Sequence, residues 1–423
     1  MKSIYFALLD QILVSGSNFL LSLILARFLS GEEYGLYIFG LTTLTVMLGL
    51  ANSTLFGSLS VLSAPLLGQR WRSSIKGHAL LFLLLIVLSV GTLTAIGALL
   101  GGGPFLANGK VLFATSAILF LHLGHEFGRV SLLSLLKSKD VFIGDCIGYG
   151  GRMLLVLGAI QCGVDQGWQL IIIFGGPSLV GVLYFWHKLD MGQIWTSCTV
   201  ERSIFLEMFR YSKWTFAEWV PFVLSGQLYV YVVTFVLGNE ANGALVACRN
   251  LVMPVTVLLV GVMNYSLPYY SRMFNEKGVQ NLLASLKKYF AALVTLVIGY
   301  LFLIYFFRVE ILYIIYGKFV EFNALVPLFA IGLFANVIYN PAEIFFRVTS
   351  KPKFLFFSRL VSAVVTTVAC YPLVTHYGIN GAVYSYILSQ LTMGLVLYLT
   401  SILHTIRRRR PAVVNSVCGS PLP

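Results

Sequence analysis

The chain alternates between long apolar stretches and short polar breaks along its whole length. Each apolar stretch has about 20 residues or more, enough for a helix to cross the roughly 30 Å hydrocarbon core of a bilayer. The breaks carry turn chemistry, as in SGEE, KSKD and HYGING. A transmembrane β-barrel would instead give alternating segments of about ten residues. The pattern predicts twelve transmembrane helices, at residues 7–29, 34–62, 78–100, 111–136, 141–161, 168–187, 212–237, 242–270, 288–307, 323–347, 354–376 and 380–404.

Composition supports a membrane protein. Of the 423 residues, 58% are hydrophobic and 11% are charged, whereas a soluble domain averages about 25% charged residues. The first apolar stretch is a full span with no small-residue cleavage site after it, so we expect no cleavable signal peptide. The predicted fold class is therefore an all-α polytopic membrane protein.

The basic residues are distributed unequally between the two sides of the predicted bundle. If the N-terminus is cytoplasmic, 21 of the 29 Lys and Arg fall in cytoplasmic segments, three in outer loops and five within spans. Positive charge is enriched on the cytoplasmic side of membrane proteins, so both termini are expected there. The net charge of +13 then reflects topology, and we expect no nucleic-acid partner. The arginines at 407–410 are expected to anchor the chain among phospholipid headgroups.

No motif indicates a cofactor, a metal or an enzymatic reaction. The sequence contains no GxxxxGKS or GxxxxGKT loop, which argues against ATP as the energy source, and no GxSxG or HExxH. The six cysteines are scattered, without CxxC spacing or a histidine at metal-ligand spacing. We therefore expect no cofactor, no metal site and no enzymatic activity.

The two halves of the chain resemble each other weakly. LSGEEYGLYI at residue 29 aligns with LGNEANGALV at residue 237, and two short matches follow in the same order. Six spans per half give both halves the same orientation, which predicts two six-helix lobes related by a parallel repeat. The lobes are expected at residues 1–200 and 201–406, with a basic cytoplasmic tail at 407–423. Transporters built from such repeats bind substrate between the halves and rock the halves against each other.

Three segments carry a resemblance to a known family. NFLLSLILARFLSGEEYGLY, LYIIYGKFVEFNALVPL and YGINGAVYSYILS resemble the polysaccharide-exporter branch of the multidrug/oligosaccharidyl-lipid/polysaccharide (MOP) superfamily, the Wzx-type O-antigen flippases. The resemblance implies a two-lobed, MATE-like transporter of the bacterial inner membrane. It also implies a substrate, undecaprenyl-diphosphate-linked oligosaccharide repeat units of O-antigen, capsule or exopolysaccharide, moved by alternating access. Polymerase and chain-length proteins would be its partners.

Two other functions are considered. A multidrug or cation antiporter of the same superfamily would need a carboxylate-dominated cavity; Asp10 could serve it, but Arg27 and Arg152 argue against cationic cargo. A membrane polysaccharide polymerase or ligase has a similar size and aromatic content. Such an enzyme carries a large periplasmic loop, which the predicted topology lacks.

Ionisable groups within the spans are the candidate functional residues. A charge at the bilayer centre costs roughly 2.5–3.5 kcal/mol on insertion scales, so each is expected to face a partner or a watery cavity. Arginine offers a planar fork of donors suited to a diphosphate, and one hypothesis is an anion path lined by Arg27, Arg129, Arg152 and Arg249. The alternative is internal salt bridging. Candidates for coupling to H⁺ or Na⁺, or for such pairing, are Asp10, His125, Glu126, Asp145, Glu218 and Glu343.

The stretch LHLGHEFGRVSLL, residues 121–133, places four of these groups on one helix face. His122, His125, Glu126 and Arg129 lie three or four positions apart. Glu126 and Arg129 are expected to pair along the helix. The stripe is either a proton-responsive cavity wall, since histidine titrates near neutrality, or a self-satisfied network between helices.

Two cytoplasmic segments have an amphipathic pattern. In SIFLEMFRYSKW, residues 203–214, and in KGVQNLLASLKKYF, residues 277–290, the apolar residues share one helix face. Both are predicted to lie on the inner leaflet. Prolines within or near the spans, among them Pro254 and Pro341, predict bent or broken helices because proline removes a backbone donor.

Overall fold

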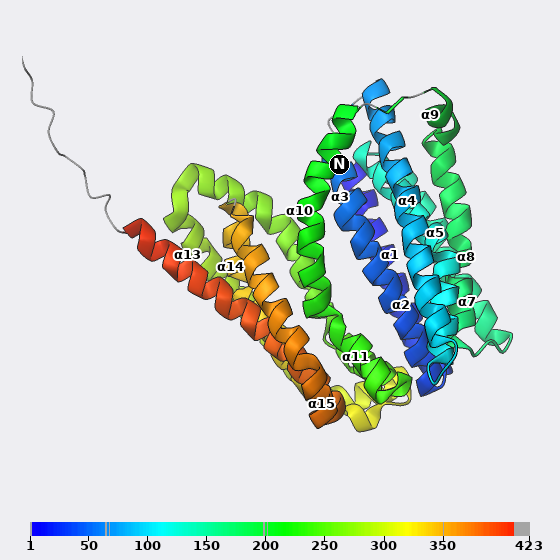
Figure 1. Ribbon diagram of the computed structural model, residues 1–423. Coiled ribbons are helices and arrows are strands. Elements are labelled where there is room, and N and C mark those ends of the chain that lie inside the picture. The colour runs from blue at the N-terminus through cyan, green and yellow to red at the C-terminus, as the bar shows by residue number, and fades with distance from the viewer. Residues whose placement is uncertain are drawn as a thin grey trace, which may run out of the picture.

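The computed structural model describes residues 2–63, 66, 68–197, 199–200, 202–349 and 351–409, in which all regular structure is helical (Figure 1). The first half contains α1 (Lys2–Phe28), α2 (Gly31–Ala51), the π-helical turn η1 (Asn52–Phe56), α3 (Gly57–Leu62), α4 (Gly68–Leu100), α5 (Leu106–Ser134), α6 (Ser138–Asp145), the π-helical turn η2 (Cys146–Gly150), α7 (Gly151–Gln161), α8 (Gly167–Lys188) and α9 (Met191–Ser197). The second half contains α10 (Arg202–Gly226), α11 (Leu228–Leu237), α12 (Asn239–Asn250), α13 (Met253–Tyr316), the 3-10 turn η3 (Val320–Phe322), α14 (Leu325–Val348) and α15 (Pro352–Arg409).

The long helices α13 and α15 each reverse direction at a glycine. Gly278 has a φ of 76° and Gly378 a φ of 59°, a left-handed conformation that glycine adopts without steric penalty. In α15, the Ser362 hydroxyl donates a hydrogen bond to the carbonyl of Ser389 at 2.8 Å, 27 positions away. A straight helix would separate these residues by about 40 Å. Each of these helices is therefore a pair of arms.

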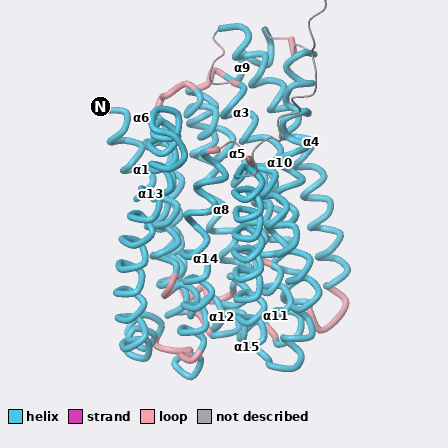
Figure 2. The backbone as a smooth tube through the Cα atoms, turned by 90° about the vertical axis from the view of Figure 1, so that its left-hand side faces the viewer, coloured by secondary structure: helices cyan, strands magenta, loops and turns pink. Residues whose placement is uncertain are grey.

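The number of membrane-crossing helices agrees with the prediction. Within the described residues nine helices are long and apolar enough to cross a membrane, and two bent pairs raise the number to eleven. The bent pairs are α10 with α11, at 43°, and α12 with the start of α13, at 53°. Counting the two arms of α15 separately gives twelve. The chain is thus an all-α, multi-pass membrane protein whose helices run roughly along one axis (Figure 2).

The helices form two lobes that meet closely at one end of the bundle. There α2 of the N-terminal lobe (α1–α9) packs against α12 of the C-terminal lobe (α10–α15). A Cβ atom on Gly35 would lie 1.7 Å from the carbonyl oxygen of Asn239, so only glycine allows this approach. Asn242 donates a hydrogen bond to the carbonyl of Gly35 at 3.3 Å, and Asn108 bonds Asn239 at 2.9 Å.

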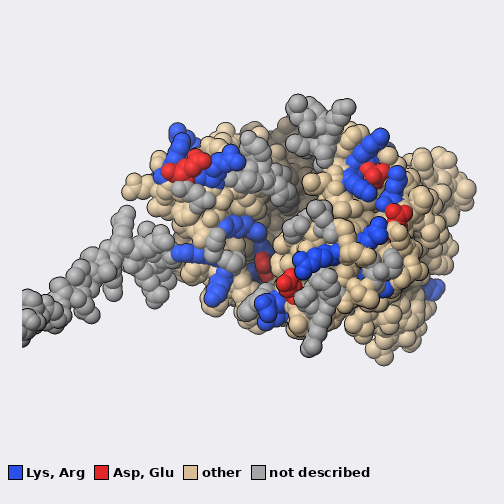
Figure 3. All heavy atoms as spheres, turned by 90° about the horizontal axis from the view of Figure 1, so that it is seen from above, with Lys and Arg blue, Asp and Glu red and all other residues tan. Residues whose placement is uncertain are grey.

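At the opposite end α13, α14 and α15 lie apart from α4 to α8 (Figure 1). This end carries α9, the reversal at Gly278 and the link between α14 and α15. Seen from this end, Lys and Arg side chains gather on the surface, which is hollowed between the lobes (Figure 3). We call it the basic end. The lobes are thus closed at one end of the bundle and separated at the other.

In the half of the bundle nearest the basic end, α10 and the π-helical turn η1 keep the lobes in contact along one side. The Ser212 hydroxyl donates a hydrogen bond to the carbonyl of Thr54 at 2.5 Å, and the Thr215 hydroxyl donates to the carbonyl of Ser53. A π-helical turn departs from the regular hydrogen-bond ladder of an α-helix and recurs at functional positions. Neither π-helical turn, at residues 52–56 or 146–150, was predicted from sequence, and the first contains the polar run Asn52 to Thr54 inside a predicted span.

Several predicted boundaries need correction. The predicted span 242–270 is broken at residues 251–252, just before Pro254, and continues beyond residue 270 within α13. The amphipathic segments 203–214 and 277–290 are not separate surface helices, because they begin the helical arms of α10 and α13. In the second segment Leu282 and Leu286 pack inside the C-terminal lobe, whereas Leu283 is exposed. Of the predicted tail, residues 407–409 continue α15 and residues 410–423 lie outside the described residues.

Candidate functional site

Arg129 on α5 is the centre of a buried polar cluster in the N-terminal lobe. Its Nε donates to Asp145 Oδ2 of α6 at 2.7 Å, and its Nη2 donates to Asp10 Oδ2 of α1 at 2.6 Å. Its Nη1 lies 3.7 Å from Glu126 Oε2, one turn earlier on α5. One guanidinium therefore connects three carboxylates on three helices, which fixes α1 and α6 against α5.

Arg152 on α7 forms the second part of this cluster. Its side chain has no exposed surface. It donates to Ser178 Oγ at 2.7 Å and lies 3.0 Å from His122 Nδ1. The guanidinium stacks on the rings of Tyr149 and Phe174, at 4.3 and 4.6 Å from their centroids. Its neighbours are therefore neutral, and π faces supply part of its stabilisation.

Tyr149 and His125 join the two parts. The Tyr149 hydroxyl donates to Glu126 Oε1 at 2.6 Å. His125 Nε2 lies 3.5 Å from Asp145 Oδ1 and 3.4 Å from the carbonyl oxygen of Gly144. We call the whole set the N-lobe cluster: Asp10, His122, His125, Glu126, Arg129, Asp145, Tyr149, Arg152 and Ser178.

The charges of the N-lobe cluster do not balance if every carboxyl group is ionised. Three carboxylates then surround the one guanidinium of Arg129, and the described contacts of Arg152 include no carboxylate. Asp10 Oδ1, Asp145 Oδ1 and His125 Nδ1 are buried without a hydrogen-bond partner in the described residues. Unpaired buried charge is costly, so one bound proton would reduce the excess negative charge. Within the described residues no group of three or more His, Cys, Asp or Glu side chains is arranged to hold a metal ion.

The four residues of the predicted stripe, His122, His125, Glu126 and Arg129, all lie on α5. Their described partners belong to the N-terminal lobe. Glu126 and Arg129 do approach each other along α5. Arg129 and Arg152, however, point into the N-terminal lobe; Arg152 is fully buried and the side chain of Arg129 is 17% exposed. Carboxylates and aromatic rings of their own lobe surround both guanidiniums. The partners Tyr149 and Ser178 were missed, since nothing in their local sequence marks them.

Arg249, at the end of α12, lies where the two lobes meet. Its Nη1 donates to the Tyr229 hydroxyl at 2.9 Å, and its Nε has no partner in the described residues. The next residue, Asn250, donates to Ser22 Oγ of α1 at 3.2 Å. Ser22 is in turn 3.0 Å from the Tyr34 hydroxyl of α2. We call these five residues the junction cluster.

The junction cluster differs in charge from the N-lobe cluster. Among its described contacts Arg249 has hydroxyl neighbours and no carboxylate. It is partly exposed, unlike Arg152. A guanidinium with unused donors and no anion beside it is suited to bind a carboxylate or phosphate oxygen.

The remaining candidates lie elsewhere. Arg27 donates to the carbonyl of Ile314 in α13 at 2.8 Å, near the closed end. Glu343 pairs with Arg347 at 2.7 Å within α14. Glu218 of α10 pairs with Arg359 of α15 at 3.3 Å. The four predicted arginines thus fall in three separate places, with Arg129 and Arg152 together inside one lobe. The anion path through all four stays a prediction.

Comparison with known proteins supports the fold. No protein-family model matches the sequence, and no curated protein matches it. The chain is similar in structure to a multidrug resistance MATE family transporter of the MOP superfamily in an inward-facing conformation, with a TM-score of 0.73 and 14% identity over 97% of this chain and 100% of that one. An outward-facing MATE family transporter gives a TM-score of 0.62 at 15% identity, over 97% of this chain and 96% of that one. The lipid II flippase MurJ, in an inward closed conformation, gives 0.69 at 16% identity, over 93% and 87%.

At these identities the likeness establishes a MATE-like fold of two six-helix lobes.

Proposed function

We propose that this protein is a flippase that moves undecaprenyl-diphosphate-linked oligosaccharide repeat units across the bacterial inner membrane by alternating access. The observation that carries the proposal is Arg249. It is a cation without a carboxylate partner in its described contacts, placed at the meeting point of the lobes of a MATE-like fold. A diphosphate would supply the anion that Arg249 lacks and would occupy the donors that Tyr229 leaves free.

The orientation follows from the distribution of charge. Cytoplasmic surfaces of membrane proteins are enriched in Lys and Arg, so the basic end is assigned to the cytoplasm, and both termini with it. The separation of the lobes at that end would then open the space between them to the side on which lipid-linked sugars are made. A reporter fused to the C-terminus should give a cytoplasmic signal, and a periplasmic signal would contradict the assignment.

The N-lobe cluster is assigned to coupling. One of the three carboxylates around Arg129 would take up a proton, which would reduce the excess negative charge beside this guanidinium. Protonation would weaken one of the bonds by which Arg129 connects α1 and α6 to α5. The N-terminal lobe would then differ between its two ion states, as a coupled transporter requires.

A multidrug or cation antiporter remains the second candidate, and one observation favours it. The carboxylates Asp10, Glu126 and Asp145 are gathered in one lobe. All three already contact Arg129, which argues against a cationic cargo there. Efflux of a cationic dye from cells expressing the protein, abolished by Asp10→Asn and unaffected by Arg249→Ala, would favour the antiporter.

The flippase proposal is tested in a strain that lacks the gene. We expect lipid-linked repeat units to accumulate on the inner leaflet and surface polysaccharide to be lost. Complementation with Arg249→Ala should fail, and Arg249→Lys should restore part of the polysaccharide because lysine keeps the charge without the planar fork. Arg308→Ala is the matched control, since Arg308 also donates to a neutral oxygen, that of Asn323 at 3.1 Å, but lies outside the junction cluster.

All strains must be compared at equal amounts of protein in the membrane. Normal surface polysaccharide in the deletion strain, without a second exporter, would refute the function. Full complementation by Arg249→Ala would remove Arg249 from the substrate path.

A further inference from the structure

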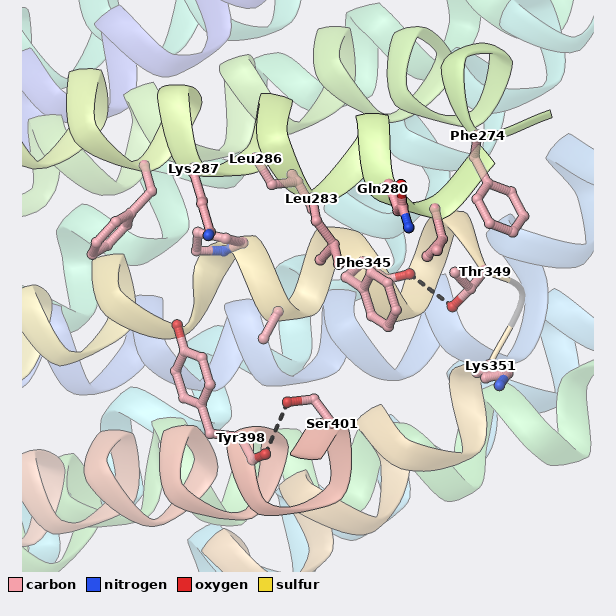
Figure 4. A pocket seen from close by; sticks show the side chains of 14 residues that line it. Phe274, Gln280, Leu283, Leu286, Lys287, Phe345, Thr349, Lys351, Tyr398 and Ser401 are labelled. Atoms are coloured by element: carbon pink, nitrogen blue, oxygen red, sulfur yellow. Dashed lines mark hydrogen bonds between the residues drawn. The ribbon is translucent and has the colours of Figure 1, made fainter. Parts of the chain in front are cut away.

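A cavity of about 500 Å³ lies within the C-terminal lobe at the basic end. It is lined by both arms of α13, the end of α14, the link after α14 and the second arm of α15 (Figure 4). None of the residues that line it belongs to the N-terminal lobe. The cavity is therefore distinct from the junction cluster and from the space between the lobes.

The wall of this cavity is mainly apolar. It includes Leu283, Leu286, Phe290 and Phe345. Leu286 is buried against the lobe, whereas Leu283 is 43% exposed, so the cavity opens along the side of α13. The segment that supplies this wall is the amphipathic stretch 277–290. Its apolar face is thus divided between the core of the lobe and an open groove.

Basic and polar groups are placed along the same groove. Lys287 and Lys351 are among the lining residues, and no Asp or Glu is. Lys287 extends from α13 toward α14, and Lys351 lies beside Thr349 near one end of the groove (Figure 4). Gln280 adds a neutral donor. The ligand that matches this lining is amphiphilic, with an apolar chain and an anionic head.

We propose that the groove binds one acidic phospholipid of the leaflet next to the basic end. The acyl chain would lie against Leu283 and Phe345, and the phosphate would lie near Lys287, because Lys351 lies toward the opposite end of the groove (Figure 4). Basic pockets between transmembrane helices on the cytoplasmic side bind acidic headgroups, and the cavity volume is within the usual range for a ligand site. Assignment to the inner leaflet rests on the orientation given under Proposed function; binding itself does not.

The position of the groove suggests why a lipid there would matter. The groove joins both arms that meet at Gly278 to α14 and α15, which are the helices that lie apart from the N-terminal lobe. A lipid in the groove would fill space that the arms otherwise leave open.

The experiment is native mass spectrometry of the purified full-length protein, titrated with phosphatidylglycerol or with phosphatidylcholine of the same acyl chains. We expect a preference for phosphatidylglycerol. Lys287→Ala should lower that preference about fivefold, the equivalent of ~1 kcal/mol for one basic residue at a membrane surface. Lys288→Ala is the matched control, because Lys288 is the next residue, is exposed and does not line the cavity. Leu283→Trp, which fills the groove, should weaken binding of both lipids.

Three results would overturn the proposal. One is equal binding of the two lipids to the unmodified protein. Another is an equal loss in Lys287→Ala and Lys288→Ala, which would indicate general attraction to a basic surface. The last is that a polyprenyl phosphate copurifies with the protein and is not displaced by excess phosphatidylglycerol. The polyprenyl lipid would then be the occupant of the groove. No transport is measured, so failure here is separate from failure of the flippase proposal.

Discussion

Replacement of Arg129 by alanine should destabilise the protein more than replacement of Arg152, the other arginine of the N-lobe cluster. Arg129 is the common partner of Asp10 and Asp145, at 2.6 and 2.7 Å, and both carboxylates are buried. Removal of one partner from a buried ion pair costs roughly 3–5 kcal/mol, because the remaining charge is stranded. In this variant three carboxylates would be left without a cation in contact.

A second substitution added to Arg129→Ala should identify which stranded carboxylate destabilises the variant. A hydrogen bond to a charged group contributes roughly 1.5–3 kcal/mol, and Arg129 makes such bonds with Asp10 and Asp145. Its 3.7 Å separation from Glu126 is beyond hydrogen-bond distance. Asp145→Asn should therefore recover much of the stability lost in Arg129→Ala, and Glu126→Gln should recover little.

The measurement is the apparent unfolding temperature of the protein purified in detergent. It is determined by size-exclusion chromatography of heated samples. Arg347→Ala is the control, because its pair with Glu343 has the same 2.7 Å separation but the Arg347 side chain is 40% exposed. Such exposed pairs contribute only about 0–1 kcal/mol. The reasoning is refuted if Arg129→Ala unfolds no earlier than Arg347→Ala, or if Glu126→Gln rescues it as well as Asp145→Asn does.

Three further predictions concern access, the contact between lobes and coupling. In a cysteine-free background Arg249→Cys should react with a membrane-impermeant thiol reagent added to the cytoplasmic side and Arg152→Cys should not; equal reaction would contradict the burial of Arg152. Thr215→Val removes the hydroxyl that donates to the carbonyl of Ser53. The loss of about 1 kcal/mol should change the ratio of populations with near and distant lobes roughly fivefold, measured as distances between spin labels on the two lobes. An unchanged distance distribution would show that this hydrogen bond does not hold the lobes together. If the N-lobe cluster takes up the coupling proton, Asp10→Asn should flatten the dependence of transport on pH, and an unaltered pH profile would remove Asp10 from coupling.

The number of helices could be predicted from the sequence because it depends on local chemistry. The length of an apolar run decides whether a helix crosses the bilayer, and glycine marks where the chain turns, as at Gly278 and Gly378. The pairing of Glu126 with Arg129 was predictable for the same reason, since residues three apart share a helix face. The breaks at Gln227 and η1 were not predicted, because the short polar runs there, Ser225 to Gln227 and Asn52 to Thr54, lie within apolar stretches long enough to form single spans.

The sequence by itself determined which ionisable groups are immersed among apolar residues, and only the tertiary structure decided what they touch. Asp10 is 119 positions from Arg129 and Ser178 is 26 from Arg152, and no local pattern relates either pair. Helix packing placed Arg129 and Arg152 inside one lobe and Arg249 between the lobes. Contacts between distant segments are fixed by the complementary packing of whole helices, whereas burial in a membrane depends on each segment's own composition.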